Sequence, residues 1–168
     1  KATQGKGGAI YNSIAAQNIE IQDSVFTLNF ATNNDPVNIT DQGFGGAVWN
    51  QGGLVLNRVT LDGNTAVLHG GGLGNKSSSG NNSTVANSTI TGNIVSTSSS
   101  EGGGIWNDSS STLVTRNMTV ADNIALLGSG ANLYNKGELV ALNSIFANTL
   151  GSSNCAGPSK LTNSDGDG

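Results

Sequence analysis

The residues that could carry out chemistry are few in this sequence of 168 residues, which holds 11 Asp and Glu residues, seven Lys and Arg residues and one His. A glycoside hydrolase needs two carboxyl groups about 5–10 Å apart. Asp62 stands two residues before a recurring asparagine and Asp122 stands one residue before another, so strand alternation places them on opposite faces. Three glutamates occupy different parts of the repeat described below: Glu20, Glu101 and Glu138. The sequence therefore predicts no paired-carboxylate site and no enzyme activity.

Nucleophilic and metal chemistry have equally little support. His69 opens the segment HGGG, which in a lipase would contribute to an oxyanion hole, but no G-x-S-x-G nucleophile elbow accompanies it. We expect His69 to lie in a solvent-exposed turn. The single cysteine, Cys155, is either a free or buried thiol or pairs with a residue outside these 168. One histidine and one cysteine cannot form a His/Cys metal cluster, and no cofactor is expected from them.

The tail NSDGDG matches the first half of a calcium-binding loop, D-x-[DN]-x-[DN]-G, through Asn163, Asp165, Asp167 and Gly168. Two interpretations are open. The tail is a polar turn or the start of a linker, or it binds calcium in a longer parent chain that supplies the closing glutamate.

Two short motifs alternate along the whole chain and indicate its architecture. The glycine motif occurs as GGAIYN at 7–12, GGAVWN at 45–50, GGGLGN at 70–75, GGGIWN at 102–107 and GANLYN at 130–135. The asparagine motif follows each of them, as FTLN at 26–29, LDGN at 61–64, ITGN at 90–93, VADN at 120–123 and IFAN at 145–148. The motifs stay constant while Ser-, Asn- and Asp-rich connections between them change in length, as loops do.

Each repeat holds short stretches of period-two alternation rich in Val, Ile and Thr, which favours strands over helices. A single repeat cannot bury its apolar side chains, whereas stacked repeats can. The sequence predicts an all-β fold, a single-stranded, right-handed parallel β-helix of about five coils that forms one domain over 1–168. The approximate coil boundaries are 5–42, 43–68, 69–100, 101–127 and 128–160.

Stacking turns equivalent residues into columns about 4.8 Å apart. Two aliphatic columns are expected in the core: Ile10, Val48, Leu73, Ile105 and Leu133, and Phe26, Leu61, Ile90, Val120 and Ile145. We expect the glycine before the aliphatic residue of the motif to allow a backbone bend or positive φ at the corner where one strand leaves another. The motif-ending asparagines are expected to tolerate the left-handed conformation and to bond to one another as structural amide ladders. The predicted ladders are Asn12, Asn50, Asn75, Asn107 and Asn135, and Asn29, Asn64, Asn93, Asn123 and Asn148.

A row of aromatic residues lies directly after the first aliphatic column: Tyr11, Trp49, Trp106 and Tyr134, with Gly74 in the gap. Alternation along a strand turns this row away from the core. An exposed aromatic row is an interaction surface for a sugar chain or a neighbouring solenoid. The alternative is that curvature or a covering loop buries it.

The paired motifs, as in Gly7–Ile10 and Phe26–Asn29, resemble the repeats of the chlamydial polymorphic outer membrane proteins. The variants GGGIWN and VADN are similar to β-helical repeats of large surface and secreted bacterial proteins. The resemblance covers residues 5–150. It implies an extracellular or cell-surface β-helix with a structural or adhesive role, and it brings no catalytic residues.

A net charge of −4 without a basic cluster argues against nucleic-acid binding, and no apolar run of about 18 residues predicts a membrane-spanning helix. Neither end of the chain reads as a capping unit, so the chain is expected to be a fragment or an uncapped subunit that stacks into fibres. The expected partners are further copies, a neighbouring solenoid, glycans or a host surface. A carbohydrate-active β-helix, a lyase or hydrolase, is the alternative function.

Overall fold

A computed structural model describes residues 5–14, 18–32, 43–77, 81–150, 152–158 and 162–163. Every regular element in these ranges is a β-strand, and short β-branched and aliphatic runs between Gly-, Asn- and Ser-rich turns account for this content. The strands are β1 (Ile10–Asn12), β2 (Ile19–Thr27), β3 (Phe30–Ala31), β4 (Val48–Asn50), β5 (Leu54–Asp62), β6 (Thr65–Ala66), β7 (Leu73–Asn75), β8 (Asn82–Ala86), β9 (Thr89–Thr91), β10 (Ile94–Val95), β11 (Ile105–Asn107), β12 (Thr112–Arg116), β13 (Thr119–Ala125), β14 (Leu133–Asn135), β15 (Glu138–Leu142), β16 (Ile145–Leu150), β17 (Cys155–Ala156) and β18 (Thr162–Asn163).

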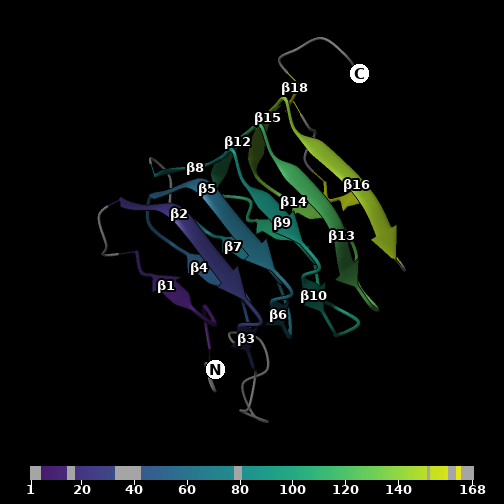
Figure 1. Cartoon of the computed structure of the whole chain (residues 1–168). Coiled ribbons are helices and arrows are strands. Elements are labelled where there is room, and N and C mark those ends of the chain that lie inside the picture. The colour runs from purple at the N-terminus through teal and green to yellow at the C-terminus, as the bar shows by residue number, and fades with distance from the viewer. Residues whose placement is uncertain are drawn as a thin grey trace.

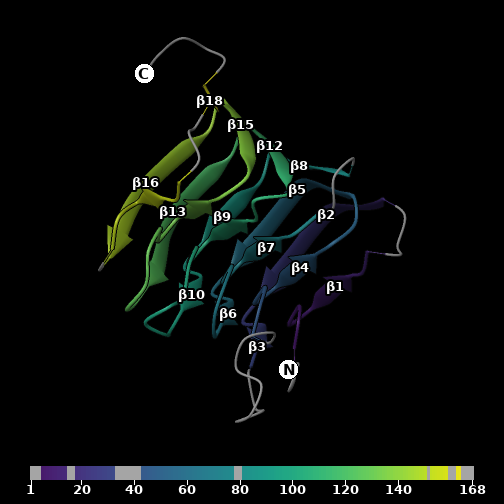
Figure 2. The ribbon, with the colours of Figure 1, turned by 180° about the vertical axis from the view of Figure 1, so that it is seen from behind.

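The strands form two sheets, and within each sheet neighbouring strands pair in parallel (Figure 1). The narrow sheet stacks the strands of the glycine motif in the order β1-β4-β7-β11-β14-β17. The other twelve strands form the wide sheet, in which β2, β5, β9, β13 and β16 run side by side. Seen from behind, β1, β4 and β7 lie in sequence order along the molecule (Figure 2). The fold is therefore the predicted all-β parallel β-helix.

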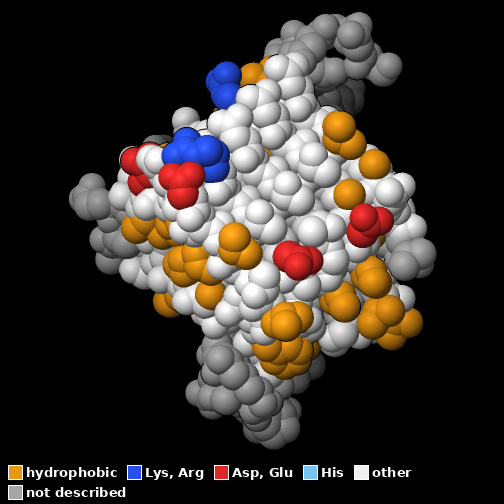
Figure 3. Space-filling model, in the orientation of Figure 1, with side chains coloured by type: hydrophobic (Ala, Val, Ile, Leu, Met, Phe, Trp, Pro, Cys, Tyr) orange, Lys and Arg blue, Asp and Glu red, His pale blue; other side chains and the backbone are white. Residues whose placement is uncertain are grey.

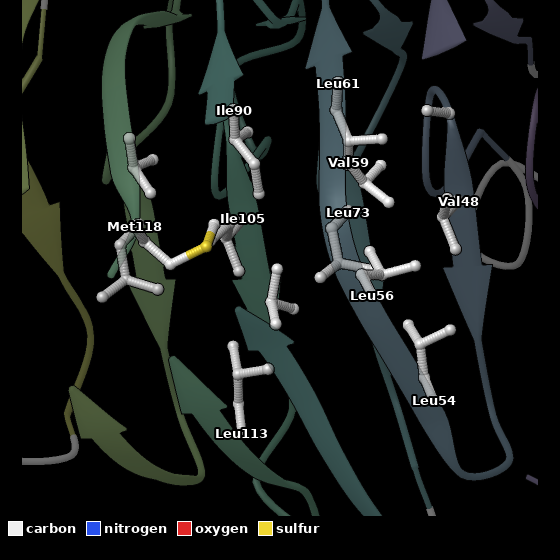
Figure 4. Close-up of a cluster of buried hydrophobic side chains, with 14 of the residues drawn as sticks. Val48, Leu54, Leu56, Val59, Leu61, Leu73, Ile90, Ile105, Leu113 and Met118 are labelled. Carbon is white, nitrogen blue, oxygen red and sulfur yellow. The ribbon is translucent and has the colours of Figure 1, made fainter. Parts of the chain in front are cut away.

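The register of the narrow sheet confirms the first aliphatic column. Ile10 pairs with Val48, Val48 with Leu73, Leu73 with Ile105 and Ile105 with Leu133. The last four are fully or almost fully buried and belong to one hydrophobic cluster with residues of the wide sheet. Figure 4 shows side chains of this cluster from both sheets pointing toward one another, among them Val48, Leu54 and Leu61.

The second aliphatic column is confirmed for its first four members and is wrong at the last. Phe26, Leu61, Ile90 and Val120 follow one another in register, and the next partner is Phe146, not Ile145. Ile145 pairs with Thr119 and is exposed. A shift of one residue along a strand sends the side chain to the opposite face. In the correct alignment of the repeats, Phe146 of the motif IFAN therefore takes the place in the column that Ile145 was expected to take.

The corners of the coil use the left-handed conformation where glycine was expected to supply it. Gly45 has φ of 64° and Gly102 has φ of 70°. A Cβ at Gly45 would lie 2.3 Å from the carbonyl oxygen of Val48, so the tight turn also excludes a side chain. The first residues of all five glycine motifs share this conformation.

Of the asparagines at the ends of the motifs, only Asn148 adopts the expected left-handed conformation, and the other nine do not. Asn50 and Asn107 are ordinary residues of β4 and β11. The left-handed residues of the wide sheet form two other columns, which bend its strands. One column is Asp23, Arg58, Asn87, Asn117 and Asn143, and the other is Leu28, Gly63, Gly92, Asp122 and Asn148. The ladder asparagines are thus selected for their amides and not for their backbone.

Candidate functional site

The first amide ladder runs unbroken along the inside of the narrow sheet. Side-chain Nδ2 donates to Oδ1 of the next coil from Asn12 to Asn50 (2.7 Å), Asn50 to Asn75 (2.8 Å), Asn75 to Asn107 (2.9 Å) and Asn107 to Asn135 (2.8 Å). All five side chains are buried. The predicted ladder is confirmed, and its direction is the same at every step.

The second ladder joins Asn29, Asn64, Asn93 and Asn123. Here the backbone N and Nδ2 of each asparagine both donate to Oδ1 of the next, at 2.9 Å. The prediction is wrong at Asn148, because Thr149 pairs with Asn123 and Asn148 is exposed.

The second ladder continues instead through two asparagines that directly precede strands of the narrow sheet, β14 and β17. Asn123 Nδ2 donates to Asn132 Oδ1 at 2.7 Å, and Asn132 Nδ2 donates to Asn154 Oδ1 at 2.8 Å. Sequence reasoning missed both residues. Their signal was the asparagine at the third position of GANLYN and of the degenerate copy SSNCAG.

The aromatic row does not form the predicted exposed surface. Trp49 is 1% exposed and Trp106 is 5% exposed, Tyr134 is half-buried, and of the four only Tyr11 is exposed. The row faces away from the aliphatic core, as alternation requires, and packs in a separate cluster. Because Gly74 has no side chain, the Trp49 ring lies over it and stacks on Trp106 with centroids 5.6 Å apart.

The residues directly before the second and third glycine motifs, Phe44 and His69, supply the rings that cover this row. Phe44 pairs with His69 as isolated neighbours in the parallel stack. The Phe44 ring stacks on Trp49 at 4.7 Å and on His69 at 5.3 Å, and His69 stacks on Trp106 at 4.9 Å. The expectation that His69 lies in an exposed turn is wrong, because its ring is held between Phe44 and Trp106.

Charged groups close the edge of this aromatic cluster around Glu101. The Glu101 carboxylate accepts hydrogen bonds from Trp106 Nε1 at 2.9 Å and Lys136 Nζ at 2.8 Å, and it lies 3.7 Å from His69 Nδ1. The Lys136 ammonium also lies 5.3 Å from the centre of the Tyr134 ring. The cluster combines an ion pair, ring stacking and a cation–π contact, and these contacts fix the outer wall of the narrow sheet.

The surroundings shift the ionisation of three groups in this cluster. Burial lowers the pKa of His69 to about 4, although the nearby Glu101 carboxylate opposes the shift. Burial alone would raise the pKa of Glu101, but the hydrogen bonds from Lys136 and Trp106 outweigh it and lower the pKa. Burial and the Glu101 charge raise the pKa of Tyr134. At neutral pH the cluster therefore holds a neutral His69 beside an ionised Glu101 carboxylate.

The outer face of the wide sheet carries straight columns that sequence reasoning missed. Thr60, Thr89 and Thr119 pair in register between Val25 and Ile145, both of which are exposed. The next outward column contains Thr27, Asp62 and Thr91. Figure 3 shows this side of the molecule as largely uncharged, with patches of apolar side chains and few Asp, Glu, Lys or Arg residues. The residue directly before each member of the second aliphatic column was the available signal.

A shallow hollow of about 320 Å³ lies where the wide sheet bends, lined by Arg116, Asn117, Leu142 and Asn143. Beside it an exposed row of amides repeats the ladder contact. Asn87 Nδ2 donates to Asn57 Oδ1 and Asn117 Nδ2 donates to Asn87 Oδ1, both at 2.9 Å. The hollow thus offers a guanidinium group and amides to a ligand.

The remaining sites suggested by the sequence add little chemistry. Cys155 is free and half-buried in β17, and burial raises the pKa of its thiol. The expected calcium ligands of the tail lie outside the described residues, except for the backbone of Asn163. Among the described residues, no three His, Cys, Asp or Glu side chains come close enough to hold a metal ion. The same residues include no helix that is long and apolar enough to cross a membrane.

Comparison of the chain with protein-family models, with curated proteins and with solved structures gives no match.

Proposed function

We propose that this chain is a non-enzymatic structural or adhesive β-solenoid of a bacterial exterior, and that the outer face of its wide sheet is the contact surface. The observation that carries the proposal is the register of Thr60, Thr89 and Thr119 on a broad, weakly charged face. The cell-surface location is supported by the resemblance of the repeat motifs alone.

The chemistry of this face suits an uncharged polysaccharide. A threonine hydroxyl both donates and accepts hydrogen bonds, and its methyl group contacts apolar surface. Parallel strands repeat these groups about every 4.8 Å along the solenoid, so a long polymer meets the same contact many times. Many weak contacts on one rigid body raise the overall affinity without any strong single site.

The ionisable groups of the narrow sheet support a structural role for that wall. The Glu101 carboxylate is engaged by Lys136 and Trp106, and the stacked His69 ring lies beside it. Groups held in such contacts stabilise the wall, and they are not presented to a substrate.

The proposal is tested by binding of the purified chain to immobilised neutral and acidic polysaccharides, with release of oligosaccharides measured in parallel. The variant T60K/T89K/T119K places three charged side chains on the proposed face. The matched control S96K/S98K/S99K adds the same charge to an exposed or partly exposed loop after β10. We expect the face variant to lose at least tenfold in binding to neutral polysaccharide while the loop control retains it. Equal losses in both variants, or release of oligosaccharides, would contradict the proposal.

A further inference from the structure

The first amide ladder has a direction, and this direction leaves one end open. Each Nδ2 donates to Oδ1 of the following coil, so every oxygen from Asn50 onward accepts a bond from the coil before it. Asn12 is the first member of the ladder and is 3% exposed, and its Oδ1 has no hydrogen-bond partner among the described residues. Buried amide oxygens are almost always paired, so this atom marks a place for a donor.

The apolar core is open at the same end. The core side chains of the first coil are only partly buried, whereas their partners in the next coil are buried almost completely. The pairs are Ile10 with Val48, Ile19 with Leu54, Ile21 with Leu56 and Phe26 with Leu61. One more layer of aliphatic side chains would bury the first coil as the second coil is buried.

Among the described strands, the backbone at this end is paired on one side. β1 and β3 are the end strands of their sheet paths, and the described partner of β2 is β5. Edge strands present a row of free N–H and C=O groups, which are a template for one further strand. Amide, side chains and backbone thus point to the same occupant, a parallel coil.

The described residues of a second copy offer no such donor at this position. The last narrow-sheet strand that the structure describes is β17, whose register with β14 places Gly157 opposite Asn135. Gly157 has no amide side chain to donate. Two copies meeting through their N-terminal ends would place the two Asn12 oxygens, both acceptors, opposite each other.

We propose that the N-terminal end of the solenoid, formed by β1, β2 and β3, docks one further parallel coil whose own asparagine donates its Nδ2 to Asn12 Oδ1. The occupant is a coil of the same repeat type with a glycine motif that ends in asparagine. The assignment deepens the proposed structural role and rests on it, because it names the partner as a neighbouring solenoid coil.

The test adds a coil of known structure to this end. A copy of residues 44–67 is joined to Gly5 in place of residues 1–4. Gly5 then takes the position that Leu68 has after Val67, since Gly5 and Gly43 accept equivalent bonds from Gly43 and Leu68. The copied Asn50 is expected to donate to Asn12 as it donates to Asn75 in the chain. We expect the melting temperature to rise by about 4 °C or more.

The matched control carries Asn50→Asp in the copied coil only. Aspartate has the same shape but replaces the donor with an acceptor, so most of the gain should be lost. An equal gain with Asn and Asp in the copied coil, or no gain with either, would overturn the proposal.

A second measurement uses the unmodified chain and does not depend on the fusion folding well. A synthetic peptide of residues 44–67 is titrated into the labelled chain, and the side-chain amide of Asn12 is followed by NMR. We expect the NMR signals of Asn12, Ile10 and Ile21 to shift when the peptide is added. At the same concentration, the Asn50→Asp peptide should cause shift changes at least tenfold smaller. Dimers or filaments of the chain alone that perturb the same signals would overturn the assignment, because a second copy would then be the occupant. Polysaccharide binding concerns another face, so either proposal can fail without the other.

Discussion

Two rows of stacked asparagines run along this solenoid, and they make the same contact in opposite surroundings. In the narrow sheet, Asn50, Asn75 and Asn107 are bonded at 2.8–2.9 Å inside the core. At the bend of the wide sheet, Asn87 and Asn117 are bonded at 2.9 Å in solvent. An exposed amide exchanges its partner for water, whereas a buried amide has no alternative. Burial, and not bond length, therefore decides how much a ladder contributes to stability.

The charged groups repeat this contrast. The Glu101–Lys136 pair is largely enclosed by aromatic rings, whereas the Arg58 and Asp23 side chains of the bend are 50% and 66% exposed. Both pairs have short contacts. Solvent screening leaves an exposed pair with little net effect.

The largest expected effect comes from breaking the buried ladder at its centre. Asn107→Ala leaves Asn75 Nδ2 and Asn135 Oδ1 without their ladder partners. Each buried unpaired group costs about 1–3 kcal/mol, so the free energy of unfolding should fall by about 3 kcal/mol or more. Urea denaturation measures this fall. An unchanged midpoint would show that water replaces the amide and would remove the distinction between the two rows.

The largely buried His69 should make the stability of the protein depend on pH. Burial lowers the pKa of His69 to about 4 from 6.5, so the unfolded chain binds the proton more readily. Stability should be complete above pH 6.5 and fall as the pH drops from 6.5 to about 4. A shift of one pKa unit corresponds to about 1.4 kcal/mol, which makes the largest loss about 3 kcal/mol.

The control for this titration is His69→Phe, which keeps a ring between Phe44 and Trp106 and removes the proton site. Its stability should be flat between pH 6.5 and 5. The lowered pKa of Glu101 adds a further loss as the pH falls through that folded pKa, and this loss should remain in the variant. Parallel pH curves for the two proteins would contradict the assignment.

The exposed row should respond much less than the buried one. Asn117 has φ of 52°, which glycine adopts without strain, so Asn117→Gly removes the amide and keeps the backbone. The unfolding free energy should change by about 0.5 kcal/mol or less. Asn117→Ala should cost about 1 kcal/mol more, because alanine resists this conformation. A loss in Asn117→Gly as large as that in Asn107→Ala would break the comparison.

The smallest effect is expected at the exposed ion pair. Asp23 has φ of 50°, which asparagine tolerates, so Asp23→Asn removes the charge without straining the bend. The Arg58 guanidinium lowers the pKa of Asp23, but solvent surrounds both groups. The melting temperature at 0.15 M salt should not change measurably. A clear decrease that added salt does not reduce would assign the pair a structural role.

The sequence alone predicted the β-helix because the repeat carries its own alignment. Positions in one column share one environment, so Asn50, Asn75 and Asn107 reveal a common partner without coordinates. Prediction failed at the last repeat, where the asparagine of IFAN suggested a register one residue away from the true one. Pairing of Thr119 with Ile145 decides that register, and it depends on contacts between coils.

The aromatic row shows a second limit of prediction from the sequence. Alternation along the strand correctly turned Trp49 and Trp106 away from the aliphatic core, but it says nothing about what lies beyond them. Phe44 and His69 cover them from a segment whose path between motifs is irregular. The left-handed bend at Asn87 and Asn117 was likewise not predicted, because the sequence does not distinguish these asparagines from the many asparagines of the loops.

The repeated motifs were enough to predict the stacked coil and its amide ladders, because periodicity can be read along a single chain. Which of the recurring groups are buried became known from the three-dimensional packing, because burial depends on every segment that covers a sheet.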